Sequence, residues 1–103
     1  MTYLIVLFNL KTAASVEAYE TWANTTDVPT VTALASVDSF QVFKNLSVMG
    51  SEEAPPYQYI EVIAVNDMNG LGTDIGSETM QRVAAEFGAF ADNPVFMISN
   101  QIA

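Results

Sequence analysis

The sequence predicts an α+β fold in which a four-stranded antiparallel sheet carries helices on one face. Three observations support this class. Segments rich in Val, Ile, Tyr and Phe, typical of strands, occur near both ends of the chain and twice in its middle. Two intervening segments carry apolar side chains at helical spacing, and Pro, Gly, Asn and Ser separate the segments. With 103 residues, 50% of them hydrophobic, we expect a single domain over residues 1–103.

The first half of the chain predicts one strand and a helical layer in two pieces. Thr2–Leu10 is apolar on both alternating faces, as in a strand that is covered on both sides. Ser15 is a predicted helix cap, followed by apolar side chains at helical spacing. We expect Asn24-Thr25-Thr26 to end this helix. Asp27 is then expected to cap a second helix, with Pro29 tolerated in its first turn.

The second half predicts a hairpin, a helix and a final strand. Val37–Val48 and Tyr57–Val65 are the predicted second and third strands, joined by a loop that holds two prolines. Asn66–Gly76 contains three glycines and is expected to be irregular. Ser77 is the predicted cap of the last helix, and Val95–Ile102 is the fourth strand. The resulting order, βαββαβ, is the ferredoxin-like arrangement, in which the first and third strands are central.

The two central strands predict a homodimer. Two helices can cover only one face of the sheet, and a sheet with one wet face should alternate apolar and polar side chains. The first and third strands do not alternate in this way, so the second face would expose a large apolar patch, which usually marks an interface. We therefore expect a second copy of the chain to pack sheet against sheet about a two-fold axis. The alternative is a monomer with a large ligand groove on that face.

The charge of the chain limits its partners. Twelve acidic residues stand against Lys11, Lys44 and Arg82, and the net charge is -9. Three cations cannot form a phosphate-binding patch, so we expect no nucleic acid and no anionic membrane surface as a partner. No stretch approaches the roughly 20 apolar residues of a membrane span. The short apolar run Leu4–Phe8 has no preceding cation, unlike a signal peptide, which predicts a cytoplasmic protein.

The absence of cysteine and histidine limits the chemistry. It excludes a disulfide, a thiol nucleophile, a Ser-His-Asp triad, a thiolate zinc site and a His-ligated haem. Acid–base chemistry must then use Asp, Glu, Tyr or Lys. The glycines at 70, 72 and 76 do not have the spacing of a dinucleotide loop. We expect no metal and no cofactor.

Glu61 is the candidate catalytic residue. It is a carboxylate among apolar neighbours on a central strand, where burial should raise its pKa. A raised pKa suits a general acid or base, or an acceptor for an N–H group of a ligand. The alternative is a structural carboxylate tied to Lys44, to a tyrosine hydroxyl or to a partner chain. Lys44 itself is expected to be a solvated lysine at the end of a strand.

Four aromatic residues are candidates for binding a flat ligand, since ligand pockets are mostly apolar with few polar groups. They are Tyr19, Trp22, Tyr57 and Tyr59. The alternative is that they are ordinary core or interface aromatics. Asp27 could also belong to a site, although helix capping explains it with fewer assumptions.

Five segments spread along the chain together resemble the REDY-like family. They are Asp27-Val28-Pro29-Thr30-Val31, Val37-Asp38-Ser39-Phe40, Tyr57-x-Tyr59-Ile60-Glu61-Val62-Ile63, Glu78-Thr79-Met80-Gln81-Arg82-Val83, and Phe87 with Phe90-Ala91-Asp92-Asn93-Pro94-Val95-Phe96. The resemblance implies a dimeric α+β barrel, which agrees with the dimer expected from the central strands. It also implies a bacterial pathway to a prodigiosin-type tripyrrole pigment, in its bipyrrole branch. It implies no particular reaction.

Three functions are compatible with these observations. The first is an enzyme or enzyme-like protein of pigment biosynthesis that binds a hydrophobic pyrrole or aromatic intermediate and transforms it without a cofactor. The second is a non-catalytic carrier of such an intermediate, or an accessory to a pathway enzyme. The third is a purely structural dimer module. The sequence alone does not decide whether a reaction is catalysed.

Overall fold

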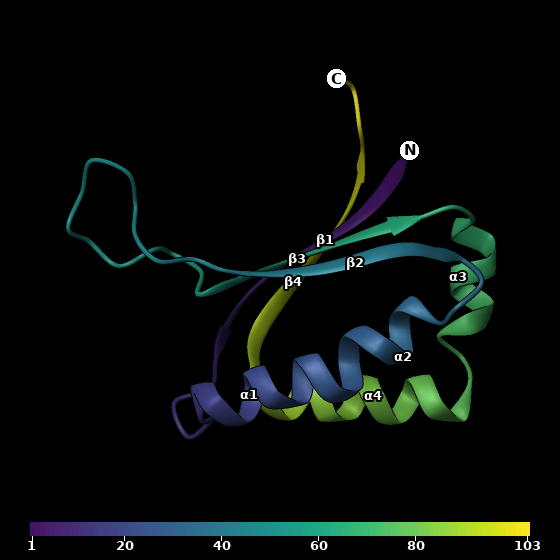
Figure 1. Cartoon of the computed structure of the whole chain (residues 1–103), viewed down its shortest axis with the longest axis horizontal. Coiled ribbons are helices and arrows are strands. Elements are labelled where there is room, and N and C mark those ends of the chain that lie inside the picture. The colour runs from purple at the N-terminus through teal and green to yellow at the C-terminus, as the bar shows by residue number, and fades with distance from the viewer.

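The computed structural model describes residues 1–103 and shows one antiparallel sheet with helices against it (Figure 1). The elements are β1 (Thr2–Leu10), α1 (Val16–Trp22), a π-helical segment (Ala23–Asp27), α2 (Val28–Thr32), β2 (Val37–Lys44), β3 (Tyr59–Val65), α3 (Met68–Asp74), α4 (Glu78–Phe90) and β4 (Ala91–Asn100). The strand order across the sheet is β2-β3-β1-β4. The predicted α+β class is confirmed, and β1 and β3 are the central strands as expected.

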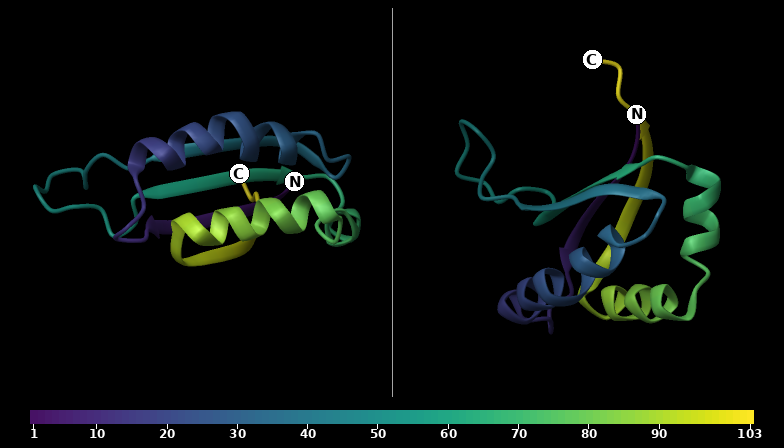
Figure 2. Two further views of the ribbon diagram at one scale, coloured as in Figure 1. Left: turned by 90° about the horizontal axis from the view of Figure 1, so that it is seen from below. Right: turned by 45° about the vertical axis from the view of Figure 1, so that its right-hand side comes forward.

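The helices lie on one face of the sheet. Figure 2 shows the α1–α2 helix and α4 side by side beneath the strands, while α3 stands at one end of the sheet. The side chains that point toward the helices are buried. They include Val6 and Phe8 of β1, both fully buried, and Tyr59 and Ile63 of β3. None of the helices combines the length and the apolar character needed to cross a membrane.

The opposite face of the sheet has no helix over it (Figure 1). The other side chains of each strand, which alternate with those that face the helices, point to this face. They include Ile5 and Leu7 of β1 and Ile60 and Val62 of β3, which are half-buried. Val95 on β4 pairs with Leu7 and is 40% exposed. The predicted apolar second face is therefore present, and this single chain leaves it uncovered.

The core beneath the helices consists of two neighbouring clusters. One is aromatic and is centred on Phe8, Tyr19, Tyr59 and Phe87. The other is largely aliphatic and includes Val31, Phe40, Ile63, Leu71 and Met80. Burying a large apolar side chain contributes about 1.5–3 kcal/mol, so these clusters hold the helices to the sheet. They also place a boundary between aromatic and aliphatic packing under the middle of β3.

The first helical layer differs from the sequence prediction. It is one continuous helix, because Asn24-Thr25-Thr26 forms a π-helical turn instead of ending α1. The segment expected to be irregular contains α3 as well. Asp67 caps that helix by accepting a hydrogen bond from the backbone N–H of Asn69 at 3.1 Å, and Leu71 anchors it in the core. The glycines of α3 lower its helix propensity, but the cap and the buried leucine override them.

Boundaries of three strands also differ, and among them β3 begins at Tyr59 and not at Tyr57, and β4 ends at Asn100 and not at Ile102. β2 ends at Lys44, and residues 45–58 form an arm that projects from the body of the domain (Figure 1). β4 begins at Ala91, before Pro94. Proline is tolerated there because β4 is an edge strand, so its missing N–H removes no interior hydrogen bond. The predicted cap of α4 is confirmed, because Ser77 Oγ accepts from the Met80 N–H at 3.2 Å.

Candidate functional site

Asp27 is brought into the interior by a widened helical turn. The backbone N–H of Val28 donates to the carbonyl of Ala23, five residues earlier, so an extra residue is accommodated in the turn. Such π-helical turns are rare and are often found at functional sites. Asp27 has helical dihedral angles and makes no capping hydrogen bond. It is 4% exposed, so the prediction that it caps a second helix is wrong.

The local sequence explains the widened turn. Asn24 Nδ2 donates to the carbonyl of Glu20 at 2.8 Å, and Thr25 Oγ1 donates to the carbonyl of Thr21 at 2.7 Å. These side chains add donors to the carbonyl groups of the preceding turn. Pro29 follows two residues after Asp27, and its ring would clash with the carbonyl four residues earlier in a regular α-helix. A wider turn before Pro29 relieves this clash and turns Asp27 toward the sheet.

Glu61 reaches the same region from the sheet. It lies on β3 opposite Val6 of β1 and Val42 of β2. Its neighbours on the same face, Tyr59 and Ile63, are buried beneath the helices, and Glu61 itself is 4% exposed. The sequence left open which layer this face would meet, and the structure places it against the helices.

Asp27 and Glu61 form a buried pair of carboxyl groups. Burial, followed by the negative charge of Asp27 and a hydrogen bond with it, raises the pKa of Glu61 to about 9. Burial also raises the pKa of Asp27, to about 6, although the hydrogen bond with Glu61 opposes this shift. Two adjacent carboxyl groups cannot both ionise easily in a buried site. At neutral pH the pair therefore holds one proton, which protonated Glu61 donates to the Asp27 carboxylate.

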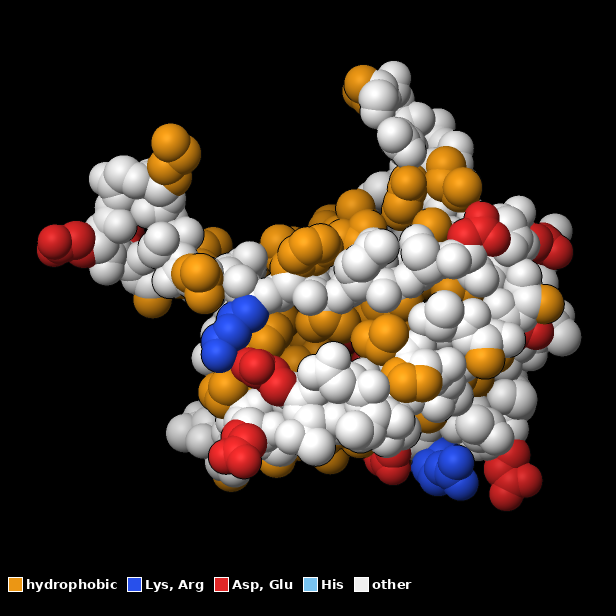
Figure 3. Space-filling model, viewed as in Figure 1, with side chains coloured by type: hydrophobic (Ala, Val, Ile, Leu, Met, Phe, Trp, Pro, Cys, Tyr) orange, Lys and Arg blue, Asp and Glu red, His pale blue; other side chains and the backbone are white.

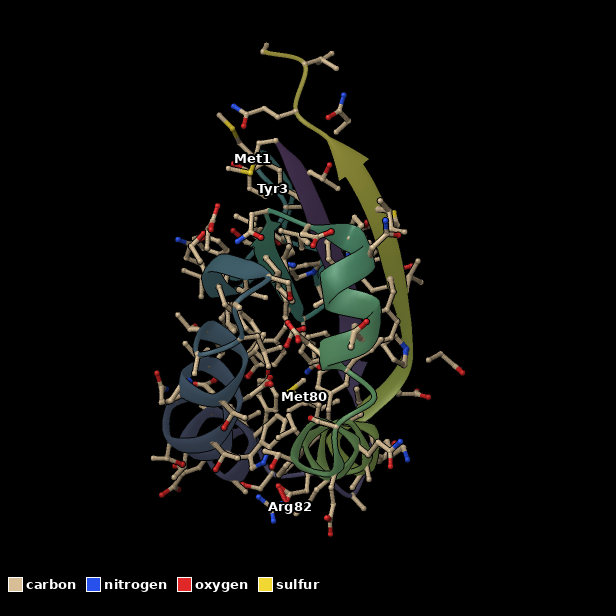
Figure 4. The ribbon with its side chains drawn as sticks, turned by 90° about the vertical axis from the view of Figure 1, so that its right-hand side faces the viewer. Met1, Tyr3, Met80 and Arg82 are labelled. Atoms are coloured by element: carbon tan, nitrogen blue, oxygen red, sulfur yellow. The ribbon has the colours of Figure 1, made fainter.

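The pair lies in the wall of a cavity of about 340 Å³ between the sheet, α2, α3 and α4. Twelve of its 15 lining residues are hydrophobic, and the polar ones are Asp27, Glu61 and Gln81. Ile75 and Phe96 line it too and are about half exposed, so the cavity opens between α3, α4 and β4 while the carboxyl pair lies at its closed end. Figure 4 shows Met80, another lining residue, pointing from α4 into this interior, whereas Arg82 points to solvent.

Two buried polar atoms have no hydrogen-bond partner, one on a residue that lines the cavity and one on a residue of the aromatic core. They are Glu61 Oε2 and the hydroxyl oxygen of Tyr19, whose side chain is fully buried. Burial and the nearby charges of Glu61 and Asp27 raise the pKa of Tyr19 above its ordinary value. More than nine in ten buried polar groups in proteins are paired, so unpaired ones mark a place that a polar group of a ligand can occupy.

Lys44, one of the alternative structural partners considered for Glu61, is engaged elsewhere. Lys44 Nζ lies 2.9 Å from Glu20 Oε2, and Tyr59 Oη donates to the same oxygen at 2.7 Å. The Tyr59 hydrogen bond, and then Lys44, lower the pKa of Glu20. Lys44 is therefore ion-paired and not simply solvated, and Glu61 receives no compensating positive charge from it.

The Lys44–Glu20 pair lies in a second hollow of about 340 Å³ between the first helix and β2. Figure 3 shows hydrophobic side chains between β2 and this helix, on the face turned to the viewer. Six of the ten lining residues are hydrophobic, and Tyr59 is among the lining residues. This hollow contains no buried, unpaired polar atom, so it lacks the feature that distinguishes the first cavity.

Three of the four aromatic residues predicted to bind a ligand belong to the aromatic core. The ring centroid of Phe8 lies 5.5 Å from that of Tyr19 and 5.4 Å from that of Tyr59. Trp22 Nε1 donates to Glu86 Oε1 at 3.1 Å, and the Trp22 ring stacks on Phe87 with centroids 6.4 Å apart. Among these aromatics only Phe87, which was not predicted as a site residue, lines the cavity with the carboxyl pair.

Tyr57 lies apart from the other predicted site residues. It precedes β3 at the base of the projecting arm, where its carbonyl accepts a hydrogen bond from Asn45 Nδ2 at 2.7 Å. The structure thus brings Glu61 together with Asp27 and leaves Tyr57 outside. No group of three or more His, Cys, Asp or Glu side chains is placed to hold a metal ion.

The fold and the site define a class of protein. It is a small α+β protein of ferredoxin-like topology that encloses an apolar cavity with one acid pair. A family model described as "REDY-like protein HapK" matches residues 2–102. The chain belongs to this family, as the resemblance in its sequence indicated.

Several solved structures have a similar fold. The crystal structure of HapK from Hahella chejuensis is 25% identical, with a TM-score of 0.79 over 99% of this chain and 93% of that one. A dimeric ferredoxin-like protein of unknown function from Thermobifida fusca is 13% identical, with a TM-score of 0.74 over 97% and 90% of the two chains. An antibiotic biosynthesis monooxygenase is 12% identical, with a TM-score of 0.70 over 100% of each chain. Among curated proteins, none matches the chain.

Proposed function

We propose that the chain is a homodimeric protein of secondary metabolism that binds a flat, hydrophobic aromatic or pyrrole intermediate in the cavity beneath the sheet and transforms it without a cofactor. The observation that carries the proposal is the acid pair at the closed end of an otherwise apolar cavity. Membership of the HapK family supports a pigment pathway of the prodigiosin type, with a bipyrrole as the intermediate.

The size and lining of the cavity support a ligand of this kind. Its volume of about 340 Å³ falls in the range of small-molecule sites. It is roughly twice the ~150 Å³ of an engineered apolar cavity that binds benzene, so two linked five-membered rings fit its scale. The unpaired Glu61 Oε2 provides an acceptor for a pyrrole N–H.

Three observations support a two-fold dimer. The sheet face opposite the helices is apolar and uncovered, and exposed apolar patches of this kind usually mark interfaces. A structural neighbour from Thermobifida fusca and another from Bacteroides fragilis are each described as dimeric and ferredoxin-like. A sheet-to-sheet dimer leaves the cavity free, because the cavity lies on the helix side.

Binding can be tested with bipyrrole as the probe and biphenyl as a ligand of similar shape without N–H groups. Trp22 is the one tryptophan and stacks on Phe87 in the cavity wall, so its fluorescence reports on occupancy. We expect bipyrrole to quench Trp22 and to bind about 2- to 10-fold more tightly than biphenyl, since a hydrogen bond to the neutral Glu61 carboxyl group contributes about 0.5–1.5 kcal/mol.

A matched pair of alanine variants locates the binding. Ala84 and Ala85 are both exposed, but only Ala84 lines the cavity. Ala84→Phe should weaken bipyrrole binding strongly, and Ala85→Phe should leave it unchanged. Equal binding by both variants would show that the ligand lies elsewhere. Binding without conversion of any bipyrrole precursor would favour the carrier or accessory function over the enzyme.

A further inference from the structure

The Asp27–Glu61 pair has a feature that a simple binding site does not need. A pyrrole N–H requires one acceptor, yet the fold brings two carboxyl groups to the same end of the cavity from opposite layers. Asp27 comes from the π-helical segment and Glu61 from the central strand β3, and each is 4% exposed. Both line the cavity, and Glu61 Oε2 has no protein partner.

We propose that Asp27 and Glu61 act together as a base and an acid that catalyse keto–enol or imine–enamine tautomerisation of a neutral, flat, apolar compound. The inference rests on the proposed function, since it assigns a reaction and a substrate class to the same cavity. Neither carboxyl group acts alone in this proposal: Asp27 removes a proton from carbon while Glu61 delivers one to the heteroatom.

The absence of a nearby cation requires the pair to keep a proton. Of the three cations, Lys44 is ion-paired with Glu20, and Lys11 and Arg82 are exposed on the surface. Two buried carboxylates without a cation would repel each other at a large cost in free energy. The stable state therefore has one carboxylic acid and one carboxylate, which is the combination that a concerted proton transfer needs. Both pKa values are raised, that of Asp27 to about 6 and that of Glu61 to about 9, and because they lie on either side of neutrality they fit this division.

The reaction balances without any other reactant. The Asp27 carboxylate takes a proton from the carbon next to a carbonyl, and the C–H electron pair becomes the new C=C bond. The carbonyl π electrons move to oxygen, which takes the proton of Glu61, and an enol results. Asp27 is now protonated and Glu61 ionised, so one proton passing from Asp27 to Glu61 along their hydrogen bond restores the pair. The same steps in reverse convert an enol into a ketone, and an imine nitrogen can replace the oxygen.

The cavity also selects the substrate class. Its walls are aliphatic and aromatic, and no basic side chain lines it, so a phosphate, a carboxylate or a coenzyme A thioester would find no counter-ion. The negative charge of the pair disfavours anions further. A neutral bicyclic ketone or imine matches both the apolar walls and the two polar groups at the closed end.

β-Tetralone, a neutral bicyclic ketone, is a suitable probe. Exchange of its α-hydrogens in deuterium oxide is measured by proton NMR, and its binding by Trp22 fluorescence. Wild-type protein should accelerate exchange about 10²–10⁴-fold over buffer, the usual range for general acid–base catalysis. Asp27→Asn should abolish the acceleration, and Glu61→Gln should reduce it at least tenfold, while both variants still bind β-tetralone. Ala85→Phe should exchange as wild type does.

The outcomes separate this inference from the proposed function. If β-tetralone quenches Trp22 but exchanges at the buffer rate, the acid–base assignment is overturned and the binding cavity stands. If neither β-tetralone nor bipyrrole binds, the proposed function fails and this inference fails with it. If Asp27→Asn does not fold, infrared spectroscopy of the wild type provides the decision. A carboxylic acid C=O band at neutral pH that disappears in Glu61→Gln supports the shared proton, and its absence from the wild type refutes it.

Discussion

Raising the pH above neutrality should destabilise the protein through Glu61. Burial raises the pKa of Glu61 to about 9, against 4.5 for an ordinary glutamate. Between these values the native state keeps the proton that the unfolded chain has lost, so unfolding releases a proton and the free energy of unfolding falls as pH rises. The loss is about 1.4 kcal/mol per pH unit, or about 2 kcal/mol from roughly pH 7 to pH 8.5. For a domain of this size the melting temperature should drop by roughly 10 °C.

The composition of the chain makes this effect measurable, because it contains no histidine or cysteine that would titrate over the same interval. The pKa values of Tyr19 and Tyr59 are both raised above their ordinary value of 10.0, so neither tyrosine ionises there. Urea unfolding at several pH values should show the slope in the wild type and not in Glu61→Gln, whose amide can still donate to Asp27. Parallel pH profiles for the two proteins would refute the assignment of a protonated Glu61.

Two further predictions concern the uncovered sheet face and the unpaired hydroxyl. Val95 on that face and Val16 on α1 are both 40% exposed, so Val95→Asp should dissociate the dimer in sedimentation experiments while Val16→Asp should not; dissociation by both, or by neither, would contradict the proposed interface. Tyr19→Phe removes a buried hydroxyl without a partner, so urea unfolding should show it to be equal in stability to wild type or up to about 2 kcal/mol more stable. A clear loss of stability in this variant would mean that the hydroxyl is hydrogen-bonded in solution.

Much of the fold could be predicted because its strands carry strong local signals. β1 has the limits that its sequence predicts, and the βαββαβ order predicts the central position of β3 in the sheet. The errors lie where tertiary contacts outweigh local propensity. Residues 68–74 contain two glycines, yet the Asp67 cap and the buried Leu71 make them a helix. Lys44 ends β2 earlier than its alternating pattern suggested, where its ion pair with Glu20 ties the strand to the first helix.

Only one of the two carboxyl groups of the candidate site could be predicted from the sequence. Glu61 is visible in the sequence because a carboxylate in the middle of an apolar strand is unusual. Asp27 is less visible and could be considered only as an alternative site residue, since an aspartate two residues before Pro29 has the pattern of a helix cap. Its inward orientation depends on the π-helical turn, which shifts the following side chains by one residue. The Asn24-Thr25-Thr26 run carries the side-chain hydrogen bonds of that turn and is the signal that could have indicated it.

Three features of the interior each cost stability, and all three meet at one place. The helix departs from regular α geometry at Asp27, two carboxyl groups share a buried position without a cation, and a cavity of about 340 Å³ remains beside them. Folding does not require the carboxyl pair, because Val6 and Val42, the register partners of Glu61, show that aliphatic side chains fit this part of the sheet. A buried polar pair that could be replaced by well-packed apolar residues is weak evidence for a structural role. Because each feature is a requirement for binding a small molecule and moving its protons, their coincidence at the end of one cavity argues for a site maintained at the expense of stability.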